Sequence, residues 1–372
     1  MSWDEWLAAR AQAREDAGLT RRLRPRDADD PMTDLAGNDY LGLSGDPRVR
    51  AAAAAAAESY GAGAGASRLV TGTLDLHAAL EAELAEWMEQ PAGLVFSTGY
   101  HANLGVVTAL ADRSTRVISD AHVHASLIDA IRLSRAAVSV VPHNDVDAVR
   151  QALAGATEER VLVVVESIYS VLGDAAPLAE LARLCGDAGA LLVVDEAHGL
   201  GVHGRGLVAS LGLGGLPHVV VTATLSKALG AQGGAVLGSA ALREHLVNTA
   251  RPFIFDTGLA PAATGGALAA LRIARTEPWL GIRVLTRVRE LADALGVIAP
   301  DGAVLSVPMS SPTAAVEAQA AALRVGLRVG CFRPPSVPDG VSRLRITASA
   351  GVPEDEWRRA VDTLITITKE HS

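Results

Sequence analysis

An isolated lysine in the middle of the chain is the residue whose chemistry most constrains a prediction. Among 33 lysine and arginine side chains only two are lysine, Lys227 and Lys369. Lys227 stands between the apolar run 219–221 and a glycine-containing segment, 230–234, whereas Lys369 lies in a polar C-terminal tail. A desolvated lysine amine can lose its proton and form a Schiff base with a carbonyl, which arginine cannot do. Codon bias explains the rarity of lysine but not this position, so Lys227 is a candidate nucleophile.

Further polar side chains follow predicted strands. Asp195 ends the apolar run 190–194, and His198 comes three positions later. The segment 97–103, Ser-Thr-Gly-Tyr-His-Ala-Asn, is a small polar turn before a predicted helix, and free backbone N–H groups there can bind phosphate. An ordinary helix cap explains the same segment. His122 and His124 are spaced so that they can bind a metal, cap the next helix or stack on a ring.

A lysine, a buried aspartate, a histidine and a phosphate-binding turn are together typical of a pyridoxal phosphate site. In such a site the lysine holds the cofactor as an imine, and the aspartate keeps the pyridine nitrogen protonated. The alternative from another class is a metal-dependent hydrolase with His122, His124, His198 and Asp195 as ligands. That alternative leaves Lys227 unexplained. A non-catalytic binding protein of the same fold is a third possibility.

The elements that must position these residues alternate along the chain. We predict helices over 76–88, 102–110, 126–133, 146–153 and 178–188, and strands over 93–97, 115–119, 137–141, 160–166, 190–195 and 219–222. Continuously apolar strands separated by helices predict an α/β fold with a mainly parallel sheet covered on both faces. Open parallel sheets bind ligands beyond the carboxyl ends of their strands, where the candidate residues fall.

The two ends of the chain follow a different pattern. A helix is predicted over 2–18, a short strand and turn over 38–44, and a helix over 47–60. After residue 240 a long helical region, 259–295, precedes short strands and a helix over 354–365. We therefore predict an N-terminal arm, 1–37, that packs with the small domain, a large domain, 38–240, and a small α+β domain, 241–372.

Composition excludes several classes of function. The formal charge of −9 over 372 residues leaves no basic surface for nucleic acid or an anionic membrane. The uncharged stretch 206–226 is interrupted by glycines and Pro217, so it is not expected to span a membrane. Two cysteines and the lack of an apolar signal segment indicate a cytoplasmic protein.

Eight motifs, spread from the N-terminal region to the C-terminal domain, together carry a family resemblance. They are Asn38-Asp-Tyr-Leu-Gly-Leu, Ser97-Thr-Gly-Tyr, His124-Ala-Ser, Asp195-Glu-Ala-His-Gly, Thr224-Leu-Ser-Lys-Ala-Leu-Gly, Arg251-Pro-Phe-Ile-Phe-Asp-Thr, Arg333-Pro-Pro-Ser-Val-Pro and Arg343-Leu-Arg-Ile-Thr. From Trp3 to the C-terminal helix the chain resembles the α-oxoamine synthases, which are fold-type I pyridoxal phosphate enzymes, and in particular the branch that acts in biotin synthesis. The resemblance implies a homodimer with its active site at the subunit interface.

The resemblance implies a role for each matched residue. Lys227 would bind the cofactor and act as acid and base at the substrate α-carbon, with His124, Asp195 and His198 as the other catalytic residues. His124 would stack on the pyridine ring, and Asp195 would pair with its nitrogen. The other implied cofactor contacts are Ser170 and His198 at the ring and its 3′-oxygen, Thr224 with the backbone of Gly99 and Tyr100 at the phosphate, and Thr257 of the partner subunit at the same phosphate. The implied substrate contacts are Arg345, which would clamp the amino-acid carboxylate, and Arg21, Asn38, His124, Arg333 and Ser336.

The activity that the resemblance implies is a decarboxylating condensation of L-alanine with a pimeloyl thioester. Pimeloyl-CoA or a pimeloyl carrier protein would donate the acyl group, and the products would be 8-amino-7-oxononanoate, CO2 and free CoA or carrier. Another acyl donor and amino acid, as in a glycine C-acetyltransferase, remains an alternative within the family. Two positions depart from the family pattern: Leu172 stands where Asp is usual, and Gly37 where Ser is usual. Neither departure affects the lysine or its partners.

Overall fold

The structure is a computed structural model that describes residues 1–17, 19–21, 23–334, 337 and 339–371. The chain divides into two compact units, residues 1–32 and 33–372. In the first unit, helix α1 (Trp3–Asp16) confirms the helix predicted over 2–18. Its N-terminus is closed by a capping box, in which the Ser2 hydroxyl accepts from the Glu5 N–H and the Glu5 carboxylate accepts from the Ser2 N–H.

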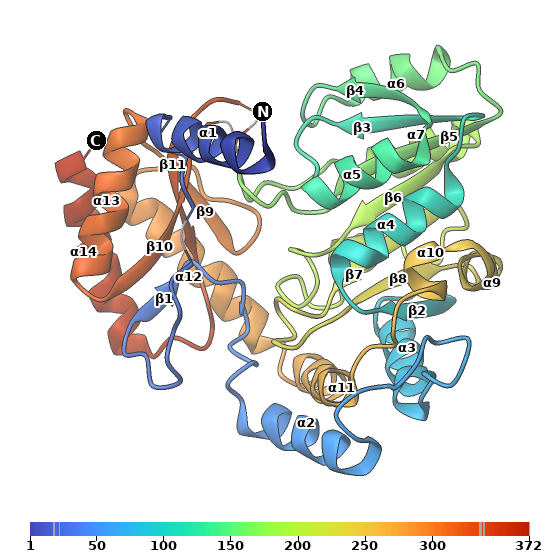
Figure 1. Ribbon diagram of the computed structural model, residues 1–372, viewed down its shortest axis with the longest axis horizontal. Coiled ribbons are helices and arrows are strands. Elements are labelled where there is room, and N and C mark those ends of the chain that lie inside the picture. Colours follow the sequence, from blue (N-terminus) through green and yellow to red (C-terminus); the bar gives the residue numbers. More distant parts are fainter. Residues whose placement is uncertain (18, 22, 335–336, 338, 372) are drawn as a thin grey trace. The chain divides into compact units, whose positions relative to one another are not determined.

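The second unit contains a seven-stranded sheet that confirms the predicted mainly parallel architecture (Figure 1). Its strands are β2 (Ala92–Phe96), β3 (Thr115–Asp120), β4 (Ala137–Val141), β5 (Arg160–Glu166), β6 (Leu191–Asp195), β7 (Val219–Thr224) and β8 (Gly234–Gly238). Their order is β2-β8-β7-β6-β5-β3-β4. Strand β8 runs antiparallel to both of its neighbours, and the other pairs are parallel. The carboxyl ends of six strands therefore meet at one edge.

Both faces of the central strands of this sheet are buried, which explains the long apolar runs in β5, β6 and β7. In β5, Leu162 and Val164 pack into one hydrophobic cluster, whereas Val163 and Val165 pack into the other. The first cluster includes residues of α4 (Gly99–Leu110), α5 (Ala125–Ser134), α9 (Ala240–Thr249) and α10 (Arg251–Ile254). The second includes residues of α3 (Asp75–Trp87), α6 (Val146–Ala154), α7 (Leu178–Ala188) and α8 (Leu207–Ser210).

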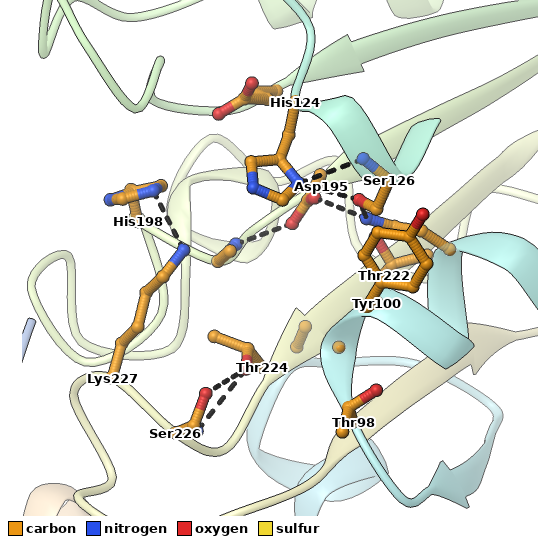
Figure 2. Close-up of a pocket in the computed structure, with 15 residues that line it drawn as sticks. Thr98, Tyr100, His124, Ser126, Asp195, His198, Thr222, Thr224, Ser226 and Lys227 are labelled. Carbon is orange, nitrogen blue, oxygen red and sulfur yellow. Dashed lines mark hydrogen bonds between the residues drawn. The ribbon is translucent and has the colours of Figure 1, made fainter. Parts of the chain in front are cut away.

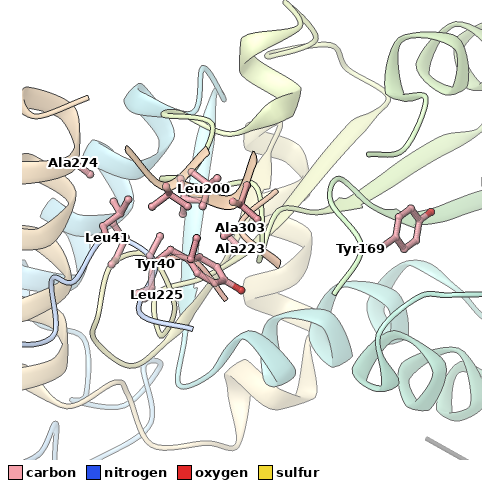
Figure 3. Close-up of a cluster of buried hydrophobic side chains, with 14 of the residues drawn as sticks. Tyr40, Leu41, Tyr169, Leu200, Ala223, Leu225, Ala274 and Ala303 are labelled. Carbon is pink, nitrogen blue, oxygen red and sulfur yellow. The ribbon is translucent and has the colours of Figure 1, made fainter. Parts of the chain in front are cut away.

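The second unit also contains a smaller, four-stranded sheet, and the second hydrophobic cluster includes residues of this sheet. Its strands are β1 (Thr33–Leu35), β9 (Val304–Pro308), β10 (Leu327–Phe332) and β11 (Arg343–Thr347), in the order β1-β10-β11-β9. Helices α12 (Trp279–Leu295), α13 (Pro312–Arg324) and α14 (Glu354–His371) pack with it. Figure 3 shows the part of the shared core that contains Tyr40, Leu41 and Leu225. None of the helices among the described residues is long and apolar enough to cross a bilayer.

Two predictions about elements were wrong or incomplete. Residues 38–44 form turns and no strand, because the Asp39 carboxylate accepts from the N–H groups of Leu43 and Ser44 at 2.9 and 3.1 Å. The strand near this position is β1, which pairs in parallel with β10. Strand β8 was not predicted, since it is short and has glycine at both ends.

The division of the chain at residue 240 stays a prediction. Helices α9, α10 and α11 (Pro261–Thr276) follow that position, and they contact α3, α4 and strands of the seven-stranded sheet. Helix α11 also packs closely on α2 (Pro47–Tyr60): a Cβ atom at Gly265 would lie 2.7 Å from the Cβ of Ala56. The packing of the arm 1–37 against a small domain stays a prediction as well.

One charged histidine, His143, connects strand ends at the carboxyl edge of the large sheet. His143, just after β4, contacts Asp120 through Nδ1 at 3.0 Å and Asp174 through Nε2 at 2.8 Å. Burial opposes a charge on this imidazole, but hydrogen bonds and charges from the two carboxylates outweigh it and raise the pKa of His143 to about 9. His143 is therefore a protonated bridge between β3, β4 and the segment after β5 at neutral pH.

Replacing His143 with glutamine is expected to destabilise the protein at pH 6 and much less at pH 10. A group whose pKa is raised by folding contributes stability that is fully present below its unfolded value, about 6.5, and that is lost as pH rises through its folded value. The loss at pH 6 should be on the order of 2–3 kcal/mol in the free energy of urea unfolding. His245→Gln, at an exposed histidine that bonds the Ala109 carbonyl, is the control. A pH-independent difference between wild type and His143→Gln would contradict the assignment.

Candidate active site

A cavity of about 240 Å³ opens at the carboxyl edge of the seven-stranded sheet (Figure 2). It is lined by residues that lie at the carboxyl end of a strand or shortly after it: Thr98, Gly99, Tyr100, Asn103, His124, Ser126, Glu166, Asp195, Ala197, His198, Thr222, Ala223, Thr224, Ser226 and Lys227. The sheet therefore fixes the positions of these side chains. The cavity lies where open parallel sheets bind their ligands.

A closed loop after β7 positions Lys227. The Leu225 N–H donates to the Gly233 carbonyl, and the Ala231 N–H donates to the Leu225 carbonyl, each at 3.0 Å. Gly230 has a φ of +59°, and a Cβ atom there would lie 2.2 Å from the Ser44 nitrogen. Only glycine therefore permits this turn to pack against the 38–44 segment.

The amine of Lys227 lies among charged and titratable groups. Its Nζ is 2.9 Å from His198 Nε2. Burial lowers the pKa of Lys227, and the positive charge of Arg345 acts in the same direction, although the carboxyl groups of Asp195 and Glu166 oppose both. A lysine with a lowered pKa carries a larger share of the neutral, nucleophilic amine at neutral pH.

Asp195 is held in place by two donors at the end of β6. Its Oδ2 accepts from Asn103 Nδ2 at 2.8 Å, and its Oδ1 accepts from the Ala197 N–H at 2.9 Å. The same Asn103 amide also donates to the Ser126 hydroxyl, which lies 2.8 Å from His124 Nδ1. Burial and the charge of Lys227 lower the pKa of His124, although Asp195 opposes them. The site thus presents a fixed carboxylate and a planar imidazole.

The N-terminus of α4 forms one wall of the cavity. The Thr98 hydroxyl caps the helix by accepting from the His101 N–H at 3.0 Å. The first N–H groups of a helix have no intrahelical partner, so those of Gly99 and Tyr100 are available to an anion. A Cβ atom at Gly99 would lie 2.9 Å from the Thr224 Cβ, so glycine allows the helix start to approach β7. This wall is suited to a phosphate group.

A second set of hydrogen bonds extends from the cavity to the small sheet. Tyr40 Oη lies 2.6 Å from His198 Nδ1 and 3.1 Å from Asn38 Oδ1. Arg345 donates to the same Asn38 oxygen at 3.2 Å and, through Nε, to the Ser170 carbonyl at 2.8 Å. Arg345 is buried on β11. Its guanidinium is thus held beside the cavity by groups from two other segments.

Glu166, at the end of β5, is a cavity residue that the sequence analysis did not select. It is fully buried; its Oε2 accepts from the Ser170 N–H at 3.1 Å, and its Oε1 has no partner among the described residues. Burial and the neighbouring charge of Asp195 raise the pKa of Glu166 well above its usual value. Thr222 Oγ1 is likewise buried without a partner in the described part of the chain. Unpaired buried polar atoms that line a cavity are suited to a polar ligand.

The geometry does not support the metal-dependent hydrolase. The ring of His122 stacks on His143, with centroids 4.1 Å apart and planes 10° apart. The other three predicted ligands make the hydrogen bonds described above. No group of three or more His, Cys, Asp or Glu side chains among the described residues is arranged to hold a metal ion.

The structure brings most of the predicted site residues together. Those that line the cavity are Gly99, Tyr100, His124, Asp195, His198, Thr224 and Lys227. Asn38, Ser170 and Arg345 join them through hydrogen bonds. Thr257 and Arg333 do not line the cavity: Thr257 is exposed and pairs with Ser67 in an isolated bridge, and Arg333 follows β10. Arg21 is exposed and belongs to the first unit, and Ser336 lies outside the described residues.

Among the site residues that the sequence analysis missed, four make the hydrogen bonds described above: Tyr40, Asn103, Ser126 and Glu166. Tyr40, Asn103 and Ser126 fall inside segments that were already singled out, and Glu166 is an acidic residue at the end of an apolar strand, as Asp195 is. That last pattern was a usable signal. The pairing of β5 with β6, which sets Glu166 opposite Asp195, was not visible in the sequence.

Comparisons with known proteins identify the family of this chain. Residues 30–364 match the family described as aminotransferase class I and II. The chain is 56% identical to the 8-amino-7-oxononanoate synthase of Mycobacterium marinum, over 95% of this chain and 92% of that protein. It is 54% identical to 8-amino-7-oxononanoate synthase 1 of Mycobacterium tuberculosis, over 95% of this chain and 93% of that protein. These matches confirm the resemblance on which the sequence analysis rested.

Solved structures of related proteins share the fold. A serine palmitoyltransferase from S. paucimobilis with bound PLP and myriocin superposes with a TM-score of 0.90 at 30% identity, covering 98% of this chain and 97% of that one. The 8-amino-7-oxononanoate synthase of Francisella tularensis superposes with a TM-score of 0.76 at 25% identity, covering 92% and 99%. The fold class predicted from the sequence is confirmed. The chain therefore belongs to the aminotransferase class I and II family, in which 8-amino-7-oxononanoate synthases are its relatives.

Proposed function

We propose that this protein condenses L-alanine with a pimeloyl thioester and releases 8-amino-7-oxononanoate, CO2 and free CoA or carrier protein, as a step in biotin synthesis. The observation that carries the proposal is the juxtaposition of Lys227, His198 and Asp195 in one cavity with a helix N-terminus. The high identity to 8-amino-7-oxononanoate synthases supports the choice of amino acid and acyl group.

The cofactor that we propose is pyridoxal phosphate, and the residues present fit it. The cavity offers an amine, a fixed carboxylate and a phosphate-binding wall. Two buried polar atoms of its lining residues, Glu166 Oε1 and Thr222 Oγ1, have no hydrogen-bond partner among the described residues. Lys227 would hold the cofactor, Asp195 its ring nitrogen, and Thr224 with the start of α4 its phosphate. When bound, pyridoxal phosphate supplies an electron sink for carbanions next to an amino group.

The residues of the chain then have distinct tasks. Arg345 binds the carboxylate of L-alanine, since a guanidinium offers two parallel donors to a carboxylate. Lys227, whose lowered pKa favours the neutral amine, takes the α-proton and later returns a proton. His124 and His198 flank the reacting region, and burial lowers the pKa of both, so they hold their places as neutral rings.

We also infer a homodimer in which Thr257 of one subunit contributes to the phosphate site of the other. Thr257 is exposed in this chain, and its bridge to Ser67 brings it beside a segment with the exposed apolar residues Leu69 and Val70. Phe255, two positions before Thr257, is exposed as well. Apolar side chains gathered at an exposed site are typical of a subunit interface. A cytoplasmic location stays a prediction.

The test is turnover by the purified chain supplied with pyridoxal phosphate, L-alanine and pimeloyl-CoA. We expect a visible absorbance band from the bound cofactor, and one free CoA thiol and one CO2 for each 8-amino-7-oxononanoate found by mass spectrometry. The pairs glycine with acetyl-CoA and L-serine with palmitoyl-CoA are the controls, expected to react at least about 100-fold more slowly. Faster turnover of either control pair would assign the protein to a sibling activity, and failure to bind pyridoxal phosphate would reject the proposal.

A further inference from the structure

A continuous chain of hydrogen bonds joins the amine of Lys227 to the guanidinium of Arg345. Lys227 Nζ is 2.9 Å from His198 Nε2, and His198 Nδ1 is 2.6 Å from Tyr40 Oη. Tyr40 Oη is 3.1 Å from Asn38 Oδ1, which is 3.2 Å from Arg345 Nη2. Tyr40 is completely buried and packs beside Leu41 and Leu225 in the core (Figure 3). Its hydroxyl is therefore shielded from exchange with solvent.

The donors and acceptors along this row of hydrogen bonds can be counted. Guanidinium groups only donate, so the Asn38 atom that faces Arg345 is the carbonyl oxygen, and Tyr40 can only donate to it. The single Tyr40 proton serves either Asn38 or His198. Burial and nearby positive charges keep the pKa of His198 well below its usual value, so the imidazole is neutral and carries one proton.

Two arrangements of protons are possible, of which only the first places a proton in every contact, and they differ at Lys227. When Tyr40 donates to Asn38, its oxygen accepts from His198 Nδ1–H, and Nε2 is free to accept from a protonated lysine. When Tyr40 donates to His198 Nδ1 instead, the proton of the ring lies on Nε2. A neutral lysine amine must then be the acceptor. The tautomer of His198 and the charge of Lys227 are thus coupled through one hydroxyl group.

We propose that Tyr40 is a positioning residue that sets the tautomer of His198 and thereby supports the protonated form of Lys227, with Arg345 and Asn38 fixing its direction. Arg345 holds the Asn38 oxygen in place as an acceptor, which turns the Tyr40 proton towards Asn38. The inference deepens the proposed function and rests on it for the role of Lys227. The chain of contacts itself involves only groups of the protein.

Other charges also act on Lys227, and a test must leave them unchanged. Asp195 and Glu166 favour its protonated form, whereas Arg345 disfavours it, and His124 faces the same cavity. Tyr40→Phe removes one oxygen atom and keeps all of these groups. His198 Nδ1 then loses its only partner among the described residues, so the tautomer that serves a protonated lysine is no longer favoured.

The experiment measures the pKa of Lys227 from the pH dependence of its reaction with acetic anhydride. The full chain, freed of bound cofactor, is labelled briefly at pH 6–11, digested and analysed by mass spectrometry. Because the chain contains only Lys227 and Lys369, the second lysine, on α14, serves as an internal standard. We expect the pKa of Lys227 to fall by about one unit in Tyr40→Phe, as the loss of one charge-assisted hydrogen bond predicts. The reactivity of Lys369 should not change.

Two further variants make the result decisive. Tyr169→Phe removes the hydroxyl of another completely buried tyrosine, whose ring packs edge-on against His143, and should leave Lys227 unchanged. Asn38→Leu removes the acceptor at the other end, so Tyr40 should donate to His198, and the pKa of Lys227 should fall as in Tyr40→Phe. It also provides the test if Tyr40→Phe does not fold.

The outcomes separate this inference from the proposed function. If Tyr40→Phe and Asn38→Leu fold, as judged by circular dichroism, and leave the pKa of Lys227 as in wild type, the proposed role of Tyr40 is wrong. That result would not affect the proposed function if wild type binds pyridoxal phosphate and turns over L-alanine. A fall in the pKa of Lys227 in these variants, in a protein that binds no pyridoxal phosphate, would support the proposed role of Tyr40 and reject the proposed function.

Discussion

Lys227→Ala is expected to lose turnover of L-alanine with pimeloyl-CoA by at least about 10⁴-fold, together with the visible absorbance of bound pyridoxal phosphate. The cavity contains no second lysine that could take over, because Lys369 lies on α14. Lys227→Arg keeps a positive charge but cannot form an imine, so it should be equally inactive. Product formation measured by mass spectrometry and the absorbance spectrum of the purified variants are the readouts.

The controls for this prediction come from the chain itself. Lys369→Ala removes the only other lysine and should retain full activity. Addition of a small amine such as ethylamine should restore part of the activity of Lys227→Ala, since the cavity left by the side chain can admit it. Near-normal turnover by Lys227→Ala would refute the assignment of this residue.

Arg345→Lys is expected to lower kcat/KM for L-alanine by about 100-fold. A lysine keeps the charge but cannot make the two parallel hydrogen bonds to a carboxylate, and the loss of one charge-assisted bond corresponds to about 1.5–3 kcal/mol. It also lacks the planar fork through which Arg345 contacts the Ser170 carbonyl with Nε and Asn38 with Nη2. Steady-state kinetics with varied L-alanine measure the effect.

Arg343→Lys is the matched control for this change. Arg343 lies two residues away on the same strand, is equally buried and pairs with Asp339. Replacing it should perturb the fold by a similar amount, yet leave kcat/KM for L-alanine within about threefold of wild type. Equal losses in both variants would show that Arg345 acts on the fold and not on the substrate.

Much of the architecture could be predicted because its signals are local. The apolar runs that became β5, β6 and β7 are buried on both sheet faces, so each one is recognisable without its neighbours. The helices predicted between the strands agree with the structure to within a few residues. Strand β8 was missed because a five-residue strand with glycine at both ends has no such pattern. The short strand predicted together with the turn at 38–44 was wrong because the carboxylate of Asp39, not the apolar pattern, decides the conformation of this segment.

The candidate site divides in a similar way. Lys227, Asp195 and His198 could be selected from residue types that follow predicted strands, and the family resemblance supplied Arg345 and Asn38. Glu166 became a site residue only when β5 paired with β6 and set it opposite Asp195. Tyr40 became one only when the turn after β1 packed against the loop that carries Lys227.

The sequence by itself therefore determined the type of fold, and it predicted Lys227 as the reactive residue and pyridoxal phosphate as the cofactor, because strand patterns, residue chemistry and motifs are properties of short segments. The tertiary structure alone decided which buried groups share protons. Hydrogen bonds between residues far apart in the sequence, such as the 2.8 Å bond from Arg345 to the Ser170 carbonyl, depend on how the two sheets pack. The link from Lys227 through Tyr40 to Arg345 belongs to this second class, since no local pattern in the chain encodes the distance between them.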